Sequence, residues 1–162
     1  MPVVDTPDST HVVSKIEPVR LEHEAGWRAL WAQYCDGAVQ TLITDATWRR
    51  ILDPQSKTGG IVATMASEVI GFVTFVEHDC TWELGPVCYV EDLFVAKAHR
   101  GRKLGVGVAM AEHLVARLNT GEWTRLYGIT RAGNDVAQAL YNQFAQGQDY
   151  KRYVIKPPAS VK

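Results

Sequence analysis

Residues 87–110 read VCYVEDLFVAKAHRGRKLGVGVAM, and this stretch carries the most informative pattern of the chain. Branched and aromatic side chains over Val87–Val95 predict a strand. A basic loop with Gly101 and Gly105 follows, and a helical pattern begins at about Val106. Glycines permit positive φ and a close backbone approach, and the N–H groups of a first helical turn carry partial positive charge. The stretch therefore predicts a strand that leads into a site for phosphate or pyrophosphate. An ordinary helix start with solvated basic residues stays open as the simpler interpretation.

The rest of the chain alternates between the periods of strands and helices. Strands are expected over Ile16–Leu21, Ile61–Met65, Val69–Glu77, Val87–Val95, Trp123–Thr130 and Tyr150–Ile155. Helices are expected over His23–Tyr34, Ala46–Leu52 (capped near Thr44 or Asp45), Val106–Leu118 and Asp135–Phe144. This order of elements predicts a mixed α/β domain around one central sheet.

The domain boundaries follow from polarity and proline content. Residues 1–15 are polar and contain prolines, which predicts a flexible N-terminal tail. We expect a single domain over residues 16–156 and a short C-terminal tail over 157–162, because no repeat and no internal linker interrupts the pattern.

Composition excludes several classes of partner. The chain has 162 residues, of which 46% are hydrophobic, and 17 Lys+Arg against 18 Asp+Glu give a net charge of −1. This balance argues against a nucleic-acid binder with a large positive field. No run approaches the ~20 apolar residues of a membrane span, and the N-terminus lacks a secretory pattern. The three cysteines, Cys35, Cys80 and Cys88, form no C-x-x-C pair, so we expect no metal site, buried free thiols and a cytoplasmic location.

The glycine loop does not fit the common nucleotide motifs. No Lys-Ser or Lys-Thr follows the glycines, as a P-loop requires, and Met110 stands where the dinucleotide fingerprint needs a small residue. The run Arg102–Gly107 instead resembles the R/Q-x-x-G-x-G/A signature of the GCN5-related N-acetyltransferases, the GNAT family. It follows the strand end Leu93–Val95, and Asn134 and Tyr141 fall at the downstream positions of that family's cofactor-contacting asparagine and its tyrosine.

The resemblance covers roughly residues 16–155 and implies a fold and a cofactor. The implied GNAT fold has a central, mostly antiparallel twisted sheet, helices on both faces, and a V-shaped split between the fourth and fifth strands. The implied cofactor is acetyl-CoA. The residues implied to bind it are Leu93, Phe94, Val95, Arg100, Arg102, Lys103, Leu104, Gly105, Val106, Gly107, Asn134 and Tyr141.

The resemblance also implies a reaction: an N-acetyltransferase in which a primary amine attacks the thioester directly. Tyr141 is the implied general acid for the departing thiolate, and Glu91 the implied base, acting directly or through water. A strand N–H near Leu93 is implied to stabilise the oxyanion. Simpler interpretations stay open: Tyr141 as a core tyrosine, a Glu91 carboxylate paired with a loop arginine, and Asn134 as an ordinary N-cap.

The acceptor is less defined than the cofactor. The implied substrate-binding residues are Trp31, Tyr34, Glu91 and Asp92, and the acceptor is a small-molecule amine or a protein amine. The stripe of Trp27, Trp31 and Tyr34 can also be simply a core or subunit-contact face. The stretch Cys35–Ala38 lacks the further aromatic residues of polyamine-type relatives. Alternatives are an enzyme that uses another acyl-CoA and a non-catalytic CoA sensor. The resemblance is also compatible with a homodimer.

Charge is distributed unevenly around this region. Between Leu93 and Ala111 there is no acidic residue, and four basic residues, Lys97, Arg100, Arg102 and Lys103, surround the glycine loop. Glu91 and Asp92 stand directly upstream. We therefore expect a positive region suited to an anionic cofactor beside a negative region suited to an ammonium group.

Overall fold

A computed structural model describes residues 15–101 and 104–158, and the chain divides into two units at residues 129 and 130. The first unit contains β1 (Lys15–Pro18), η1 (Leu21–His23), α1 (Glu24–Cys35), α2 (Thr41–Leu52), β2 (Thr58–Met65), β3 (Glu68–His78), β4 (Val87–Val95), η2 (Lys97–His99), α3 (Val106–Asn119) and β5 (Arg125–Gly128). The second unit contains α4 (Asp135–Tyr141). The predicted tail over residues 1–15 lies outside the described residues apart from Lys15, as do residues 159–162 of the predicted C-terminal tail.

The strands form one five-stranded sheet in the order β1-β2-β3-β4-β5. The first three ladders are antiparallel, and β4 pairs with β5 in parallel over Val87–Val90 and Arg125–Gly128. The expected mostly antiparallel sheet is thus confirmed. Its parallel edge is a consequence of α3, which connects β4 to β5 across one face of the sheet.

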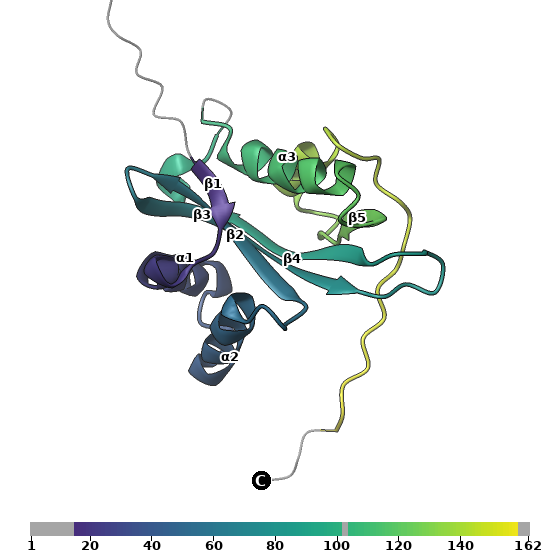
Figure 1. Ribbon diagram of the computed structural model, residues 1–162, viewed down its shortest axis with the longest axis horizontal. Coiled ribbons are helices and arrows are strands. Elements are labelled where there is room, and N and C mark those ends of the chain that lie inside the picture. The colour runs from purple at the N-terminus through teal and green to yellow at the C-terminus, as the bar shows by residue number, and fades with distance from the viewer. Residues whose placement is uncertain (1–14, 102–103, 159–162) are drawn as a thin grey trace, which may run out of the picture. The chain divides into compact units, whose positions relative to one another are not determined.

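Helices cover both faces of the sheet, as predicted (Figure 1). On one face, α1 and α2 enclose a core of aromatic and aliphatic side chains: Val19, Trp27, Leu30, Trp31, Trp48, Ile51, Val62, Val69 and Phe72. Trp27 is fully buried at its centre and stacks on Trp31 with the ring centroids 5.1 Å apart. On the other face, α3 packs Val106, Met110 and Leu114 against the alternate residues of the same strands.

The first two helices show where local signals succeed and fail. The spacing of Trp27, Leu30 and Trp31 predicted α1, which ends at Asp36 in a left-handed conformation with φ 45°. By contrast, α2 begins at Thr41, five residues before the expected Ala46. Thr44 and Asp45 therefore lie inside the helix and cannot be its N-cap, which is Gln40. The Thr44 hydroxyl accepts a hydrogen bond from Trp31 Nε1 at 3.0 Å.

One glycine allows α3 to approach the sheet closely. A Cβ atom on Gly71 of β3 would lie 3.0 Å from the Phe94 carbonyl oxygen and 3.1 Å from Met110 Cε. A larger residue would therefore push α3 away from β3 and β4. The start of α3 is in this way held at a fixed height above the end of β4.

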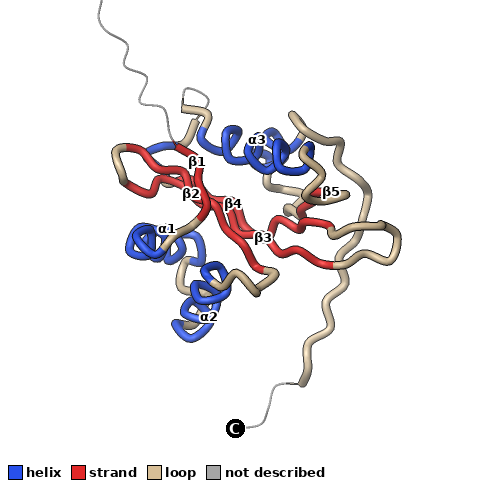
Figure 2. Tube along the Cα trace, in the orientation of Figure 1, coloured by secondary structure: helices blue, strands red, loops and turns tan. Residues whose placement is uncertain are grey.

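The C-terminal region differs from the prediction. β5 is confined to Arg125–Gly128, α4 ends at Tyr141, and residues 142–158 form no helix or strand (Figure 2). The expected strand over Tyr150–Ile155 is wrong, although its residues favour β-structure. A strand exists only through hydrogen bonds to a neighbour, which a local pattern cannot supply.

None of the described helices has both the length and the apolar character that crossing a membrane requires.

The aromatic core beneath α1 gives a prediction for stability. Replacing the fully buried Phe72 with alanine removes ring contacts with Trp27, Trp31, Tyr34 and Phe94. We expect Phe72→Ala to lower the free energy of unfolding by about 3–5 kcal/mol in urea titrations. Leu42→Ala on α2, where the side chain is 78% exposed, is the control and should change it by less than about 0.5 kcal/mol. Equal effects of the two variants would contradict this core.

Candidate active site

A β-bulge interrupts β4 at Glu91. Thr74 of β3 is the register partner of Asp92, whereas the next residue, Phe75, is the partner of Val90. Glu91 is therefore the extra residue on β4. The ladder with β5 ends at the same place, since Val90 and Gly128 form its last pair, while β4 continues to Val95. Beyond the bulge, β4 keeps its ladder with β3 and has lost its ladder with β5.

The backbone beyond the bulge has a defined polarity. Ala96 donates its N–H to the Ile70 carbonyl of β3 at 2.8 Å. Because successive residues of a strand direct their N–H and C=O groups to opposite sides, Phe94 also faces β3, and Leu93 and Val95 face the side on which β5 has ended. The structure thus gives Leu93 and Val95 the edge position that was predicted to meet the cofactor.

Arg100 is attached to this edge. Its Nε donates a hydrogen bond to the Val95 carbonyl oxygen at 2.7 Å, and its guanidinium lies 4.8 Å from the centre of the Phe94 ring. The positive charge of the glycine loop is in this way held directly beside the end of β4.

The N-terminus of α3 has the geometry of an anion site. Gly105 is its N-cap with φ 59°, and Gly101 has φ 117°, so both occupy the left-handed region where glycine is favoured. A Cβ on either glycine would meet no heavy atom within 4 Å, and among the described residues no side chain caps the helix. The first-turn N–H groups, which include those of Val106 and Gly107, have no helical acceptor and fit a phosphate.

Of the other loop residues predicted to bind the cofactor, the structure describes two and leaves two outside the described residues. Val106 is 2% exposed, so it would act only through its backbone, and Leu104 is 47% exposed. Arg102 and Lys103 lie outside the described residues.

The two predicted carboxylates differ in their surroundings. Glu91 is exposed, and Asp92 is half-buried and accepts a hydrogen bond from the Thr74 hydroxyl. Val73 packs under α3, so the next residue of β3, Thr74, points to the opposite face, which α1 covers. Asp92 is the register partner of Thr74 and points to the same face. Thr74 was not among the residues predicted for the site. Its signal is a lone hydroxyl within the apolar run of β3.

The predicted aromatic residues of α1 also differ. Tyr34 is 39% exposed and packs on Phe94 with the ring centroids 5.6 Å apart, which brings the end of α1 beside β4. Trp31 is 8% exposed and belongs to the core. It also lines a cavity of about 250 Å³ between α1 and α2, together with Arg28, Cys35 and Thr44.

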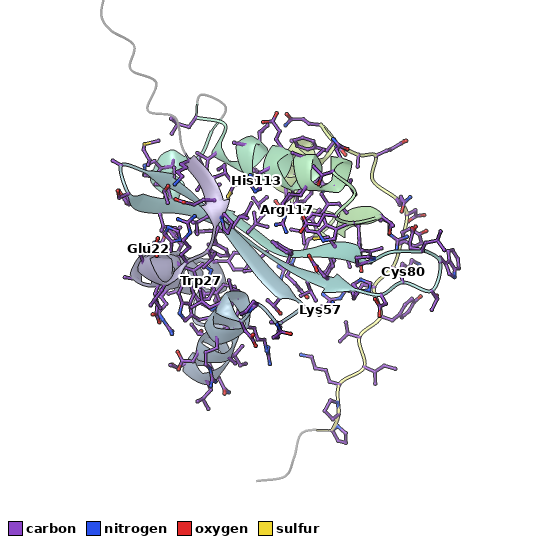
Figure 3. All side chains as sticks on the ribbon, in the orientation of Figure 1. Glu22, Trp27, Lys57, Cys80, His113 and Arg117 are labelled. Carbon is purple, nitrogen blue, oxygen red and sulfur yellow. The ribbon has the colours of Figure 1, made fainter. Side chains whose placement is uncertain are left out.

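The cysteines occupy three different environments. Burial raises the pKa of Cys35, and the negative charge of Asp92 adds to this rise. Burial raises the pKa of Cys88 to about 12. Cys80 lies in the loop between β3 and β4, at the outer end of that hairpin (Figure 3). Cys88 is thus the buried thiol that was expected, whereas Cys35 and Cys80 are half-buried.

The second unit contains the two remaining predicted residues. Asn134 is the N-cap of α4, and its Oδ1 accepts a hydrogen bond from the Ala137 N–H at 3.2 Å. The ordinary capping interpretation of Asn134 is therefore confirmed. Tyr141 is the last residue of α4 and is half-buried.

The described part of the chain has no group of three His, Cys, Asp or Glu side chains that could hold a metal ion.

These features together define a class of protein. A strand that loses its neighbour at a bulge and then leads through a glycine loop to a helix N-terminus suits a coenzyme A-dependent acyltransferase. The model of the acetyltransferase (GNAT) family matches residues 20–145, so the chain belongs to this family. The expectation of an N-acetyltransferase that uses acetyl-CoA is thereby confirmed.

Named relatives agree with this assignment. The chain is 33% identical to the D-amino-acid N-acetyltransferase HPA3 of Saccharomyces cerevisiae, over 87% of this chain and 89% of that protein. The fold is similar to the aminoglycoside N-acetyltransferase AAC(6')-Iy in complex with CoA, with a TM-score of 0.77 at 19% identity over 95% and 99% of the two chains. It is also similar to a ribosomal-protein-alanine N-acetyltransferase from Brucella melitensis, with a TM-score of 0.72 at 21% identity over 88% and 98%.

The raised thiol pKa gives a second prediction. At pH 8, a pKa of about 12 leaves Cys88 with a thiolate fraction on the order of 10⁻⁴, so native Cys88 should resist alkylation. Mass spectrometry of iodoacetamide-treated protein would measure labelling at each cysteine, with urea-unfolded protein as the control. Labelling of native Cys88 at the unfolded rate would contradict this environment.

Proposed function

We propose that the protein transfers an acetyl group from acetyl-CoA to a primary amine by direct attack within a ternary complex. The observation that carries this proposal is the combination at the end of β4. The ladder with β5 stops at the bulge, the edge of Leu93 and Val95 faces the vacated side, and the glycine loop follows. No cysteine nucleophile is needed, which agrees with the raised pKa values of Cys35 and Cys88.

Two groups of backbone atoms would hold the cosubstrate. The edge of Leu93 and Val95 would pair with the pantetheine arm, and Phe94 lies between them. The backbone from Arg102 to Gly107 would bind the pyrophosphate, with Arg100 beside it and Asn134 adding a contact. Acetyl-CoA supplies a thioester whose carbonyl carbon accepts the amine. A strand N–H near Leu93 would stabilise the negative charge that develops on the carbonyl oxygen.

Arg100 and the pantetheine arm would compete for the same hydrogen-bond acceptor on β4. Its hydrogen bond to the Val95 carbonyl uses an acceptor that the pantetheine arm would otherwise reach. We therefore expect the Arg100 side chain to leave Val95 and turn its charge toward the pyrophosphate.

Glu91 and Asp92 would receive the acceptor. The ammonium of the acceptor must lose a proton before it attacks, and Glu91, exposed at the bulge, would take this proton directly or through water. Asp92, oriented by the Thr74 hydroxyl, would attract the ammonium. Tyr34 would offer a ring face to it, and Trp31 would act as the support beneath Tyr34.

Tyr141 would act as the general acid. A phenol with a pKa of about 10 can protonate a thiolate with a pKa of about 8.5 only with help from its position and the local field. Its contribution is therefore expected to be modest.

Small-molecule amines are the favoured acceptors over protein amines. The yeast relative is named for D-amino acids, and two of the similar structures are named for aminoglycosides. One structural neighbour is named for a ribosomal protein, so a protein amine is the second candidate. A cytoplasmic location and a homodimer remain predictions of the sequence.

A thiol-release assay tests this function. Purified protein is incubated with acetyl-CoA and a panel of small amines, amino acids and lysine peptides, and free CoA is measured. We expect release that depends on a small primary amine and saturates with it. Longer acyl-CoA thioesters in the same assay test the choice of acyl group. Binding of acetyl-CoA without turnover across the panel would instead indicate a CoA sensor.

The role of Tyr141 gives a further prediction. Tyr141→Phe removes the proton donor but keeps the ring, so kcat should fall by about 10-fold, the lower end of general acid catalysis, with the affinity for acetyl-CoA nearly unchanged. Tyr150→Phe in the same unit is the matched control, because Tyr150 is 84% exposed and has no proposed role. Unchanged kcat in Tyr141→Phe would remove Tyr141 from the mechanism.

A further inference from the structure

Two tyrosines lie side by side where the β4–β5 ladder is about to end. Tyr89 of β4 and Tyr127 of β5 are register partners, with ring centroids 5.0 Å apart and an interplanar angle of 33°. The next register pair, Val90 and Gly128, is the last of this ladder. The tyrosine pair therefore borders the point at which the two strands cease to be joined.

The tyrosines share a face of the sheet with Asp92. Cys88 and Val90 pack in the core under α3, so Tyr89 between them points to the opposite face, which is the α1 face. Asp92 points to the same face, because the bulge at Glu91 shifts the alternation of β4 by one residue. On the α1 face, Tyr89 of β4, paired with Tyr127 of β5, is thus followed along β4 by the Asp92 carboxylate.

Tyr127 is held in one orientation by His78. Its hydroxyl lies 2.8 Å from His78 Nε2, and His78 Nδ1 lies 2.8 Å from the Asp79 carbonyl oxygen. A carbonyl can only accept, so Nδ1 of the neutral ring carries the proton and Nε2 accepts from the Tyr127 hydroxyl. The ring is fixed in this way although Tyr127 is still 36% exposed. A fixed, partly exposed aromatic surface loses little conformational entropy when it binds a ligand.

We propose that the Tyr89–Tyr127 pair binds the side group of the acceptor, and that the preferred acceptors are primary amines with an aromatic group on a short linker. The inference rests on the proposed function and specifies its substrate class. Tyr89 and Asp92 pair with Val76 and Thr74, which are two residues apart on β3, so an ammonium at the acidic pair lies roughly 7 Å along the sheet from Tyr89. This spacing suits an aryl group separated from the amine by about two carbons. The carboxylates attract the ammonium, and the rings stack with the aryl group.

Paired kinetics with two amines test the preference. The wild-type protein should show a higher kcat/KM for 2-phenylethylamine than for n-butylamine. Tyr89→Leu and Tyr127→Leu keep an apolar side chain but remove the ring, so the ratio of the two kcat/KM values should fall by about 3- to 10-fold, mainly through KM for 2-phenylethylamine. Trp82→Leu is the matched control, since Trp82 is an 89% exposed aromatic residue in the β3–β4 loop and should leave the ratio unchanged.

The results that would overturn this inference differ from those that would overturn the proposed function. The inference would be overturned, with amine acetylation intact, if wild-type kcat/KM for 2-phenylethylamine does not exceed that for n-butylamine. It would also be overturned if both leucine variants keep the wild-type ratio of these two values. If neither amine is acetylated, NMR titration of 2-phenylethylamine into CoA-saturated wild-type protein shows whether the tyrosine pair binds the aryl group. Shifts of the Tyr127 and Gly128 amides that n-butylamine does not cause would support the tyrosine site, and their absence would overturn it.

Discussion

The extra residue at Glu91 is the constraint on which the site depends. Without a bulge, residues three apart on a strand point to opposite faces, so Tyr89 and Asp92 would be separated by the sheet. With it, both point to the α1 face, and β4 keeps its register with β3 on either side of the bulge. The ladder with β5 ends at the same level, so the Leu93 N–H, which points away from β3, no longer meets β5. One inserted residue thus sets both the edge that is proposed to bind the thioester and the face that is proposed to bind the acceptor.

The two cores hold this arrangement in place. Phe72 and Phe94 are register partners whose rings pack against α1, and this contact fixes the end of α1 and Tyr34 beside β4. On the opposite face, Gly71 lets Met110 approach β3 and thereby fixes the start of α3. The positive glycine loop and the acidic pair are consequently attached to opposite ends of one rigid segment of β4, and in the proposed function an anionic cosubstrate and a cationic acceptor would meet between them.

Much of this arrangement follows from local sequence. The bounds of β4 and the start of α3 were predicted at Val87–Val95 and Val106, because an unbroken run of branched and aromatic residues and a glycine boundary are strong signals. The start of α2 was missed because Leu42 and Ile43 are exposed and do not extend the apolar stripe. The strand over Tyr150–Ile155 was wrong because pairing depends on a distant neighbour. The split was implied by family resemblance, and the roles of Thr74 and Tyr127 depend on register, which the residues alone do not reveal.

Amide hydrogen exchange at Leu93 and Phe94 tests the central claim most directly. Phe94 directs its N–H to β3, whereas Leu93 directs its N–H to the side that β5 has left. NMR-detected exchange should therefore show a protected Phe94 amide with and without CoA. The Leu93 amide should exchange fast in the free protein and become protected when CoA binds. A Leu93 amide that is already protected without CoA, or one whose exchange CoA leaves unchanged, would contradict the account.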